Sequence, residues 1–140
     1  MNKARAGFTL IELLVAMALL VFVASLGAGI TVNFYRSQIF AGDTKNFLAA
    51  LLRARSEAMD NLDGQAHGLR LEENGYQFLA GGEAAGLKFE LAPGVKLTAP
   101  AAVEFEALSG RTAPAALTLT DGSSGRSVNF VLNREGTINY

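Results

Sequence analysis

An apolar run near the amino terminus constrains this chain more than any other feature. Residues 7–20 read GFTLIELLVAMALL and contain one ionisable side chain, that of Glu12. An ionisable group within a membrane-spanning helix costs about 2.5–3.5 kcal/mol on insertion scales, so it usually serves a function. We therefore expect a helix that enters a membrane and a carboxylate that has a specific task there.

The length of the run fits a single membrane crossing. Residues 8–30 would form a helix about 34 Å long, and the hydrocarbon core of a bilayer is about 30 Å thick. Lys3 and Arg5 precede the run without an acid, so the positive-inside rule places residues 1–7 in the cytoplasm and the later residues outside. Ala24, Ser25 and Leu26 make a poor signal-peptidase site, so we expect the apolar helix to be retained.

Composition limits what the rest of the chain can be. Its 140 residues leave room for one modest domain. There is no cysteine, so an exported domain must be stabilised by packing and not by disulfides. The formal net charge of −1 provides no basic field of the kind that indicates nucleic-acid binding.

A helical pattern continues beyond the apolar run. Arg53 and Glu57 form an i, i+4 pair, and asparagine, aspartate and glycine at residues 61–64 predict the end of the helix. We expect residues 31–63 to be an amphipathic continuation of the first helix. Its apolar residues recur at spacings of three and four or their sums, and they are Phe40, Phe47, Leu48, Leu51, Leu52, Met59 and Leu62.

Gly27 and Gly29 lie where the two halves of the helix meet. Each glycine weakens a helix by about 1 kcal/mol relative to alanine, which predicts bending or local melting. Small residues also permit close contact between helices in a membrane or a filament. Both interpretations remain open at this point.

From residue 64 the pattern predicts antiparallel strands. Segments 68–72 and 76–80 flank Glu73, Asn74 and Gly75, and Asn-Gly between alternating segments indicates a hairpin. Further strands are predicted at 87–91, 95–99, 102–108, 115–120, 127–132 and 137–140, with 84–86 and 121–125 as loops. The expected fold class is α+β: a long amino-terminal helix, membrane-spanning in its first half, packed on one small antiparallel sheet of residues 64–140.

The amino-terminal residues resemble the class III leader of type IV pilins and pseudopilins. The resemblance rests on Lys3 and Arg5, then Gly7 and Phe8, and then Glu12 within an apolar helix. It implies that residues 1–7 are a leader, that a prepilin peptidase cleaves between Gly7 and Phe8, and that the new amino group of Phe8 is methylated. It also implies that the partners are other pilins or pseudopilins, the inner-membrane assembly platform and, before assembly, membrane lipid.

The resemblance suggests a role for Glu12 in assembly. A carboxylate buried among apolar helices needs a partner, and the family implies the amino group of Phe8 on a neighbouring subunit. We hypothesise that this pair aligns each subunit with the next; the amino group of the same chain is the other candidate. The surrounding apolar residues would contact lipid before assembly and neighbouring helices afterwards.

The remainder resembles the GspH/FimT family of minor pseudopilins and minor pilins. The pattern comprises residues 47–58, the later segments 103–105, 117–119 and 128–130, and glycines at 110 and 136. It implies a structural subunit that initiates or caps a type II secretion pseudopilus or a type IV pilus. Both machines share the leader, so the sequence leaves the choice between them open.

The alternative function is that of a filament-tip adhesive or DNA-capturing minor pilin. DNA-binding FimT-like pilins carry an arginine motif at the carboxy terminus, whereas residues 136–140 of this chain contain no base. Arg111, Arg126 and Arg134 could form a small cationic patch for weak phosphate contacts. A solvated sheet edge or turn is the favoured use of these arginines, and nucleic acid is not an expected partner.

The sequence does not favour catalysis. His67 is the only histidine, and no cluster of cysteine, histidine and carboxylate provides a nucleophile with its base or a metal site. We expect no enzyme activity, no cofactor and no metal. A structural or solvated role is the expectation for His67.

Overall fold

The structure is a computed structural model that describes residues 8–140, without the side chains of residues 26–33. The described residues form two compact units, one up to Gln38 and one from Ile39 to Tyr140. The helix α1 (Leu10–Met59) takes part in both and is followed by a short 3₁₀ helix η1 (Leu62–Gly64) and eight strands. The strands are β1 (His67–Glu72), β2 (Gly75–Ala80), β3 (Glu83–Glu90), β4 (Val95–Thr98), β5 (Ala102–Phe105), β6 (Ala115–Asp121), β7 (Ser127–Leu132) and β8 (Ile138–Asn139).

The predicted fold class, a long amino-terminal helix packed on a small antiparallel β domain, is confirmed. The leader of residues 1–7 lies outside the described residues. The helix α1 continues without a break through Gly27 and Gly29, so local melting is not seen there, whereas bending and close helix contact at these glycines stay predictions. Within the part of the chain that the structure describes, no helical segment has both the length and the hydropathy of a bilayer-crossing span.

The helix ends for a local reason. Asn61 takes a left-handed conformation with φ 52°, and asparagine tolerates this geometry better than most residues. The main-chain N–H of Leu108 donates a hydrogen bond of 2.8 Å to the carbonyl oxygen of Ala58 in the last turn. The same carbonyl oxygen also accepts the main-chain N–H of Asn61 at 3.1 Å, so the loop before β6 adds a second donor to the end of α1.

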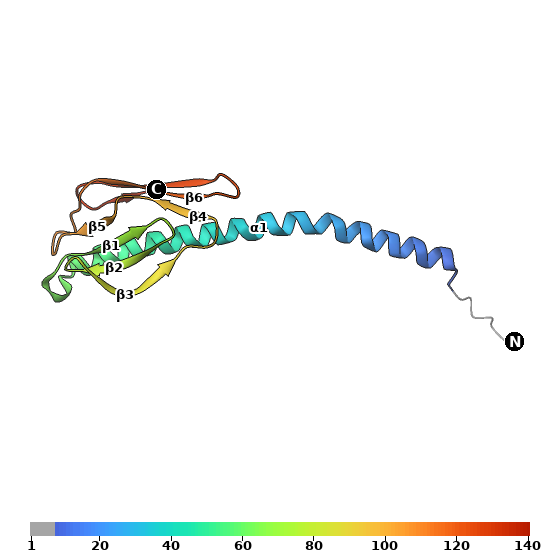
Figure 1. Ribbon diagram of the computed structural model, residues 1–140, viewed down its shortest axis with the longest axis horizontal. Helices are drawn as coiled ribbons and strands as arrows, with labels where there is room; N and C mark the ends of the chain where they lie inside the picture. The colour runs from blue at the N-terminus through green and yellow to red at the C-terminus, as the bar shows by residue number, and fades with distance from the viewer. Residues whose placement is uncertain (1–7) are drawn as a thin grey trace. The chain divides into compact units, whose positions relative to one another are not determined.

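The β domain contains two antiparallel sheets, where the sequence had led us to expect one. The strand orders are β3-β2-β1-β5 and β4-β6-β7-β8. In Figure 1 the strands of both sheets lie beside the carboxy-terminal part of α1. The expectation was wrong because chain order does not give pairing: β5 returns to pair with β1, while β4 pairs with β6.

Most strand predictions agree with the structure, and the main exception is β3. The predicted hairpin is present, with Glu72 opposite Gly75, so that Glu73 and Asn74 form its two-residue turn. Residues 84–86 are part of β3 and not a loop. A bulge lies between Ala84 and Lys88, because Gln77 pairs with Lys88 whereas Leu79, two residues later, pairs with Ala84.

The core joins α1 to both sheets. Phe47 is fully buried, and its ring lies 5.4 Å from that of Tyr76 on β2 and 5.3 Å from that of Phe130 on β7. On the helix the buried stripe also includes Ala50, Ala54 and Ala58, which the pattern of large apolar residues did not reveal. Conversely, three members of the predicted stripe are about half exposed: Leu52, Met59 and Leu62.

Two glycines allow the energetic cost of a steric clash to be measured apart from the cost of a strained backbone conformation. Gly136 and Gly125 have similar positive φ angles, +74° and +69°. A Cβ on Gly136 would collide with the carbonyl oxygen of Gly110, whereas a Cβ on Gly125 would meet no atom within 4 Å.

We expect Gly136→Ala to lower the free energy of unfolding by about 1–3 kcal/mol more than Gly125→Ala, because only the former adds a backbone clash to the cost of the left-handed conformation, about 1–2 kcal/mol. Chemical denaturation of both full-length variants in the same detergent measures the difference. Equal losses would show that the contact between Gly110 and Gly136 does not limit the packing there.

Candidate assembly site at the amino-terminal helix

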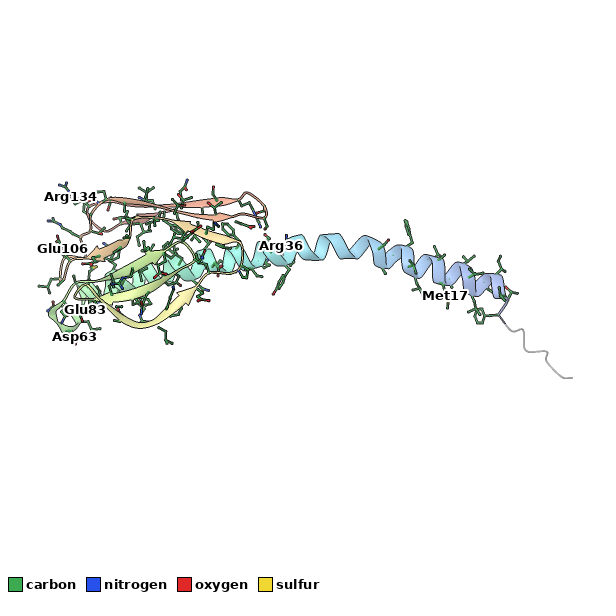
Figure 2. The ribbon with its side chains drawn as sticks, viewed as in Figure 1. Met17, Arg36, Asp63, Glu83, Glu106 and Arg134 are labelled. Carbon is green, nitrogen blue, oxygen red and sulfur yellow. The ribbon has the colours of Figure 1, made fainter. Side chains whose placement is uncertain are left out.

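The first turns of α1 expose apolar side chains on every side. Every large apolar residue from Phe8 to Val23 is between 53% and 80% exposed. Figure 2 shows these side chains, Met17 among them, standing away from the helix. Soluble monomers rarely expose a continuous apolar surface of this extent, and such a surface usually marks a site of contact with lipid or with other proteins.

Glu12 and Thr9 form a reciprocal capping box at the start of α1. The main-chain N–H of Thr9 donates to Glu12 Oε2 at 3.4 Å, and the N–H of Glu12 donates to Thr9 Oγ1 at 3.3 Å. The Thr9 hydroxyl is also 3.5 Å from Glu12 Oε2. The Thr9 N–H thus has a side-chain partner, and the Glu12 N–H, which also donates to the Thr9 carbonyl oxygen at 3.1 Å, has a second acceptor.

The capping box gives Glu12 a partner within its own chain. Its carboxylate lies in the first helical turn, where the helix dipole favours negative charge. Both members of the box follow the predicted cleavage point between Gly7 and Phe8, so cleavage there would leave the box in place. Phe8 is 80% exposed beside it, whereas Gly7 lies outside the described residues.

Capping is thus a second role for Glu12, beside the predicted pairing with an amino group, and it is not among the sequence-based expectations. The signal was present, because threonine followed three residues later by glutamate before an apolar run is the capping-box pattern.

The structure places the three candidate DNA-contacting arginines at different locations. Arg126 lies at the start of β7, where its Nε donates to Ser124 Oγ at 3.0 Å and its guanidinium is 5.7 Å from the centre of the Phe40 ring. Its Nη2 is 3.6 Å from Asp121 Oδ2. These contacts indicate that Arg126 helps hold the β6–β7 turn against the helix.

Arg111 and Arg134 belong to neighbouring segments at the other end of β7. The N–H of Thr112 donates to the carbonyl oxygen of Arg134 at 3.3 Å, and both arginines are exposed. Figure 2 shows Arg134 at the end of the β domain that also carries Glu106. At about 3.3 Å per residue, the length of β7 separates Arg126 from Arg134 by roughly 20 Å, so the three side chains do not form one compact patch.

His67 is buried, and both of its ring nitrogens lie near polar atoms that connect neighbouring elements of the fold. It is 4% exposed, and its Nε2 lies 2.9 Å from the carbonyl oxygen of Leu62, which can only accept a hydrogen bond. Its Nδ1 lies 3.6 Å from Glu57 Oε2. The ring therefore connects the beginning of β1 to η1 and to the last turns of α1.

Among the described residues, no three histidine, aspartate or glutamate side chains come together in a way that could hold a metal ion.

Asp121 organises the β6–β7 turn through hydrogen bonds to its carboxylate. The hydroxyls of Ser123 and Ser124 donate to it at 2.6 and 2.5 Å, and the N–H of Ser123 donates at 2.9 Å. These bonds, with the Ser123 hydroxyl contributing most, hold the pKa of Asp121 well below its usual range. A carboxylate with a lowered pKa stabilises the fold above its unfolded-state pKa of about 3.9, and this contribution is lost as the pH falls.

We therefore expect Asp121→Asn to be most destabilising near pH 7, with a difference from the unmodified chain that shrinks as the pH falls below about 4. Denaturant titrations of both full-length proteins across this pH range measure it. Ser124→Ala, which removes one of these hydrogen bonds, should produce a smaller difference of the same pH dependence. A difference that did not vary with pH would contradict this account of the turn.

Comparison with known proteins gives one finding, and it concerns the amino terminus. The family model described as the prokaryotic N-terminal methylation motif matches residues 2–28. No curated protein and no solved structure matches the chain. The matched residues contain the capping box and the exposed apolar turns of α1, and this motif suggests inner-membrane anchoring, processing by a prepilin peptidase and assembly with other pilins. The chain therefore carries a type IV pilin-like amino-terminal signal, which indicates a structural subunit.

Proposed function

We propose that this chain is a minor pilin or pseudopilin that initiates or caps a type II secretion pseudopilus or a type IV pilus. The observation that carries the proposal is the exposed apolar surface from Phe8 to Val23, on a helix that also bears the methylation motif. Such a surface suits two successive environments, lipid before assembly and neighbouring helices afterwards. A filament extends through contacts in which one surface meets a different surface of the next subunit.

The β domain supports the minor-subunit part of this proposal. It resembles the GspH/FimT type in its helix segment, residues 47–58, and in the glycines at 110 and 136. Both glycines take positive φ angles, and Gly136 packs against Gly110 and Arg55 beside the end of α1. The backbone conformation at both positions, and the close contact at Gly136, therefore explain why glycine occurs there.

The topology that we propose follows from the same signal. Residues 1–7 lie in the cytoplasm, residues 8–30 cross the inner membrane once, and the β domain faces the periplasm. After cleavage and methylation of Phe8, the assembly platform draws the subunit into the filament.

In this proposal Glu12 has one partner before assembly and another during assembly. Before assembly its carboxylate accepts the main-chain N–H of Thr9 in the capping box. During assembly it pairs with the methylated amino group of Phe8 on the neighbouring subunit, which sets the register between subunits. A charge that leaves water needs such a partner, because an unpaired buried carboxylate is strongly unfavourable.

Two substitutions at this position separate the two roles. Glutamine at the third helical position can still complete a capping box, whereas alanine cannot. We expect Glu12→Gln and Glu12→Ala both to abolish co-assembly with partner pilins, because neither keeps the negative charge. Only Glu12→Ala should also lose the capping interaction, which the exchange rate of the Thr9 amide proton reports.

The measurement is co-purification of the epitope-tagged variant with sheared filaments or with partner pilins cross-linked in the membrane. Arg53→Gln, which removes an exposed charge from the carboxy-terminal part of α1, is the matched control and should assemble normally. Normal assembly of Glu12→Gln would show that capping, and not charge, is what Glu12 contributes.

Processing provides an independent test of the leader. We expect mass spectrometry of the membrane-extracted chain to show a new terminus at Phe8 that carries one methyl group. Replacing the predicted cleavage-site glycine, as in Gly7→Val, should leave the leader attached and keep the chain out of filaments. A chain that keeps residues 1–7 in the presence of an active prepilin peptidase would contradict the proposed function.

A further inference from the structure

A second feature of the helix lies beyond the methylation motif. Phe34 and Tyr35 are 64% and 65% exposed, and Arg36 beside them is also exposed. Adjacent residues on an α-helix point about 100° apart, so these three side chains spread over roughly 200° of the helix surface. A stripe that packs on one partner recurs instead every three or four residues, as Phe47, Leu51, Ala54 and Ala58 do further along α1.

We infer that Phe34, Tyr35 and Arg36 form a belt that sits in the outer polar interface of the membrane and fixes how deeply α1 is inserted before assembly. This inference rests on the proposed function, because it requires the helix to cross a bilayer. The occupant of the surface is the lipid headgroup region, with the Arg36 guanidinium directed to lipid phosphate.

The spacing along the chain supports this location. No charged residue occurs between Glu12 and Arg36. At 1.5 Å per residue the helix from Glu12 to Tyr35 is about 34 Å long, slightly more than the hydrocarbon thickness of about 30 Å. When Glu12 is at the cytoplasmic interface, the aromatic pair therefore reaches the opposite interface.

The chemistry of the three side chains matches that interface. Tyrosine is enriched at membrane–water boundaries because its ring is apolar and its hydroxyl is polar. A long arginine side chain can keep its apolar stem along the helix while its charged group reaches phosphate and water. An aromatic pair followed by arginine thus presents decreasing hydrophobicity in the outward direction.

The belt would have a consequence for processing. By fixing the depth of α1 it would keep Phe8 and Glu12 at the cytoplasmic surface, where a prepilin peptidase acts. A helix that slid outward would draw these residues into the hydrocarbon region.

The chain contains no tryptophan, so a single inserted tryptophan reports its own environment. The test uses full-length Tyr35→Trp reconstituted in phosphatidylglycerol–phosphatidylcholine vesicles. Quenching by lipids brominated at different depths and by aqueous acrylamide locates the indole. Leu20→Trp is the control for the middle of the span, and Tyr140→Trp, at a position of the β domain that is 74% exposed, is the control for water.

We expect Leu20→Trp to be quenched most by deep bromines, Tyr140→Trp only by acrylamide, and Tyr35→Trp by shallow bromines together with acrylamide. Adding Arg36→Gln to Tyr35→Trp should change the depth at which bromolipids quench the indole most strongly, because the contact between the guanidinium and lipid phosphate is lost. Lys45→Gln, which removes an exposed charge from α1 nine residues beyond Arg36, should leave the profile unchanged.

Each of three other results would overturn a specific part of this inference. If Leu20→Trp is deep while Tyr35→Trp behaves like the water control, the belt is wrong and the proposed function is untouched. If Tyr35→Trp is protected from both quenchers in proportion to protein density, a second copy of the chain covers this surface and the lipid assignment fails. If no bromolipid quenches Leu20→Trp, the helix is not inserted, and membrane anchoring fails together with the belt.

Discussion

The β domain depends on the burial of one ring. Phe47 contacts Tyr76 from the first sheet and Phe130 from the second, so a single helical residue joins both sheets to α1. Fully burying an aromatic side chain contributes about 1.5–3 kcal/mol, and edge-on ring contacts add further stabilisation. Because the chain has no cysteine, packing of this kind must provide what disulfides supply in many exported domains.

The two parts of α1 thus suit different environments. Around Phe47 its apolar residues form a stripe, and alanines at 50, 54 and 58 let the strands approach closely. From Phe8 to Val23 it is apolar on every side and lacks a covering partner within the described chain. The apolar surface thus changes along α1 from all-round to one-sided. This change is typical of a helix whose first part is covered by lipid or by other helices and whose second part packs on a domain that faces water.

The sequence predicted the elements better than their arrangement. Periodicity of two and turn residues were sufficient to locate most strands, because these signals are local. The division into two sheets was missed, since the pairing of β5 with β1 across more than thirty residues leaves no local trace. The bulge in β3 was missed because Ala84, Ala85 and Gly86 have the composition of a loop.

The same distinction applies to the candidate site. The importance of Glu12 followed from the cost of an acid in an apolar run, whereas its capping partner Thr9 required attention to a three-residue spacing. The separation of Arg126 from Arg134 followed from the predicted strand at 127–132, which these two residues flank. The place of Arg111 beside Arg134 could not be predicted, because it depends on which loops meet at that end of β7. The sequence left open whether the three arginines form one patch.

The bulge in β3 has a consequence for the behaviour of many copies at high local concentration. β3 is at the edge of its sheet, and its residues are largely exposed. A regular exposed edge would offer a continuous row of main-chain donors and acceptors to any other unpaired strand, a common route to irreversible aggregation. The two extra residues near Gly86 interrupt that row, and Gln77 Nε2 donates to the Gly86 carbonyl oxygen at 3.0 Å. Other copies of the chain are therefore discouraged from adding a strand to this edge, even when they are crowded together.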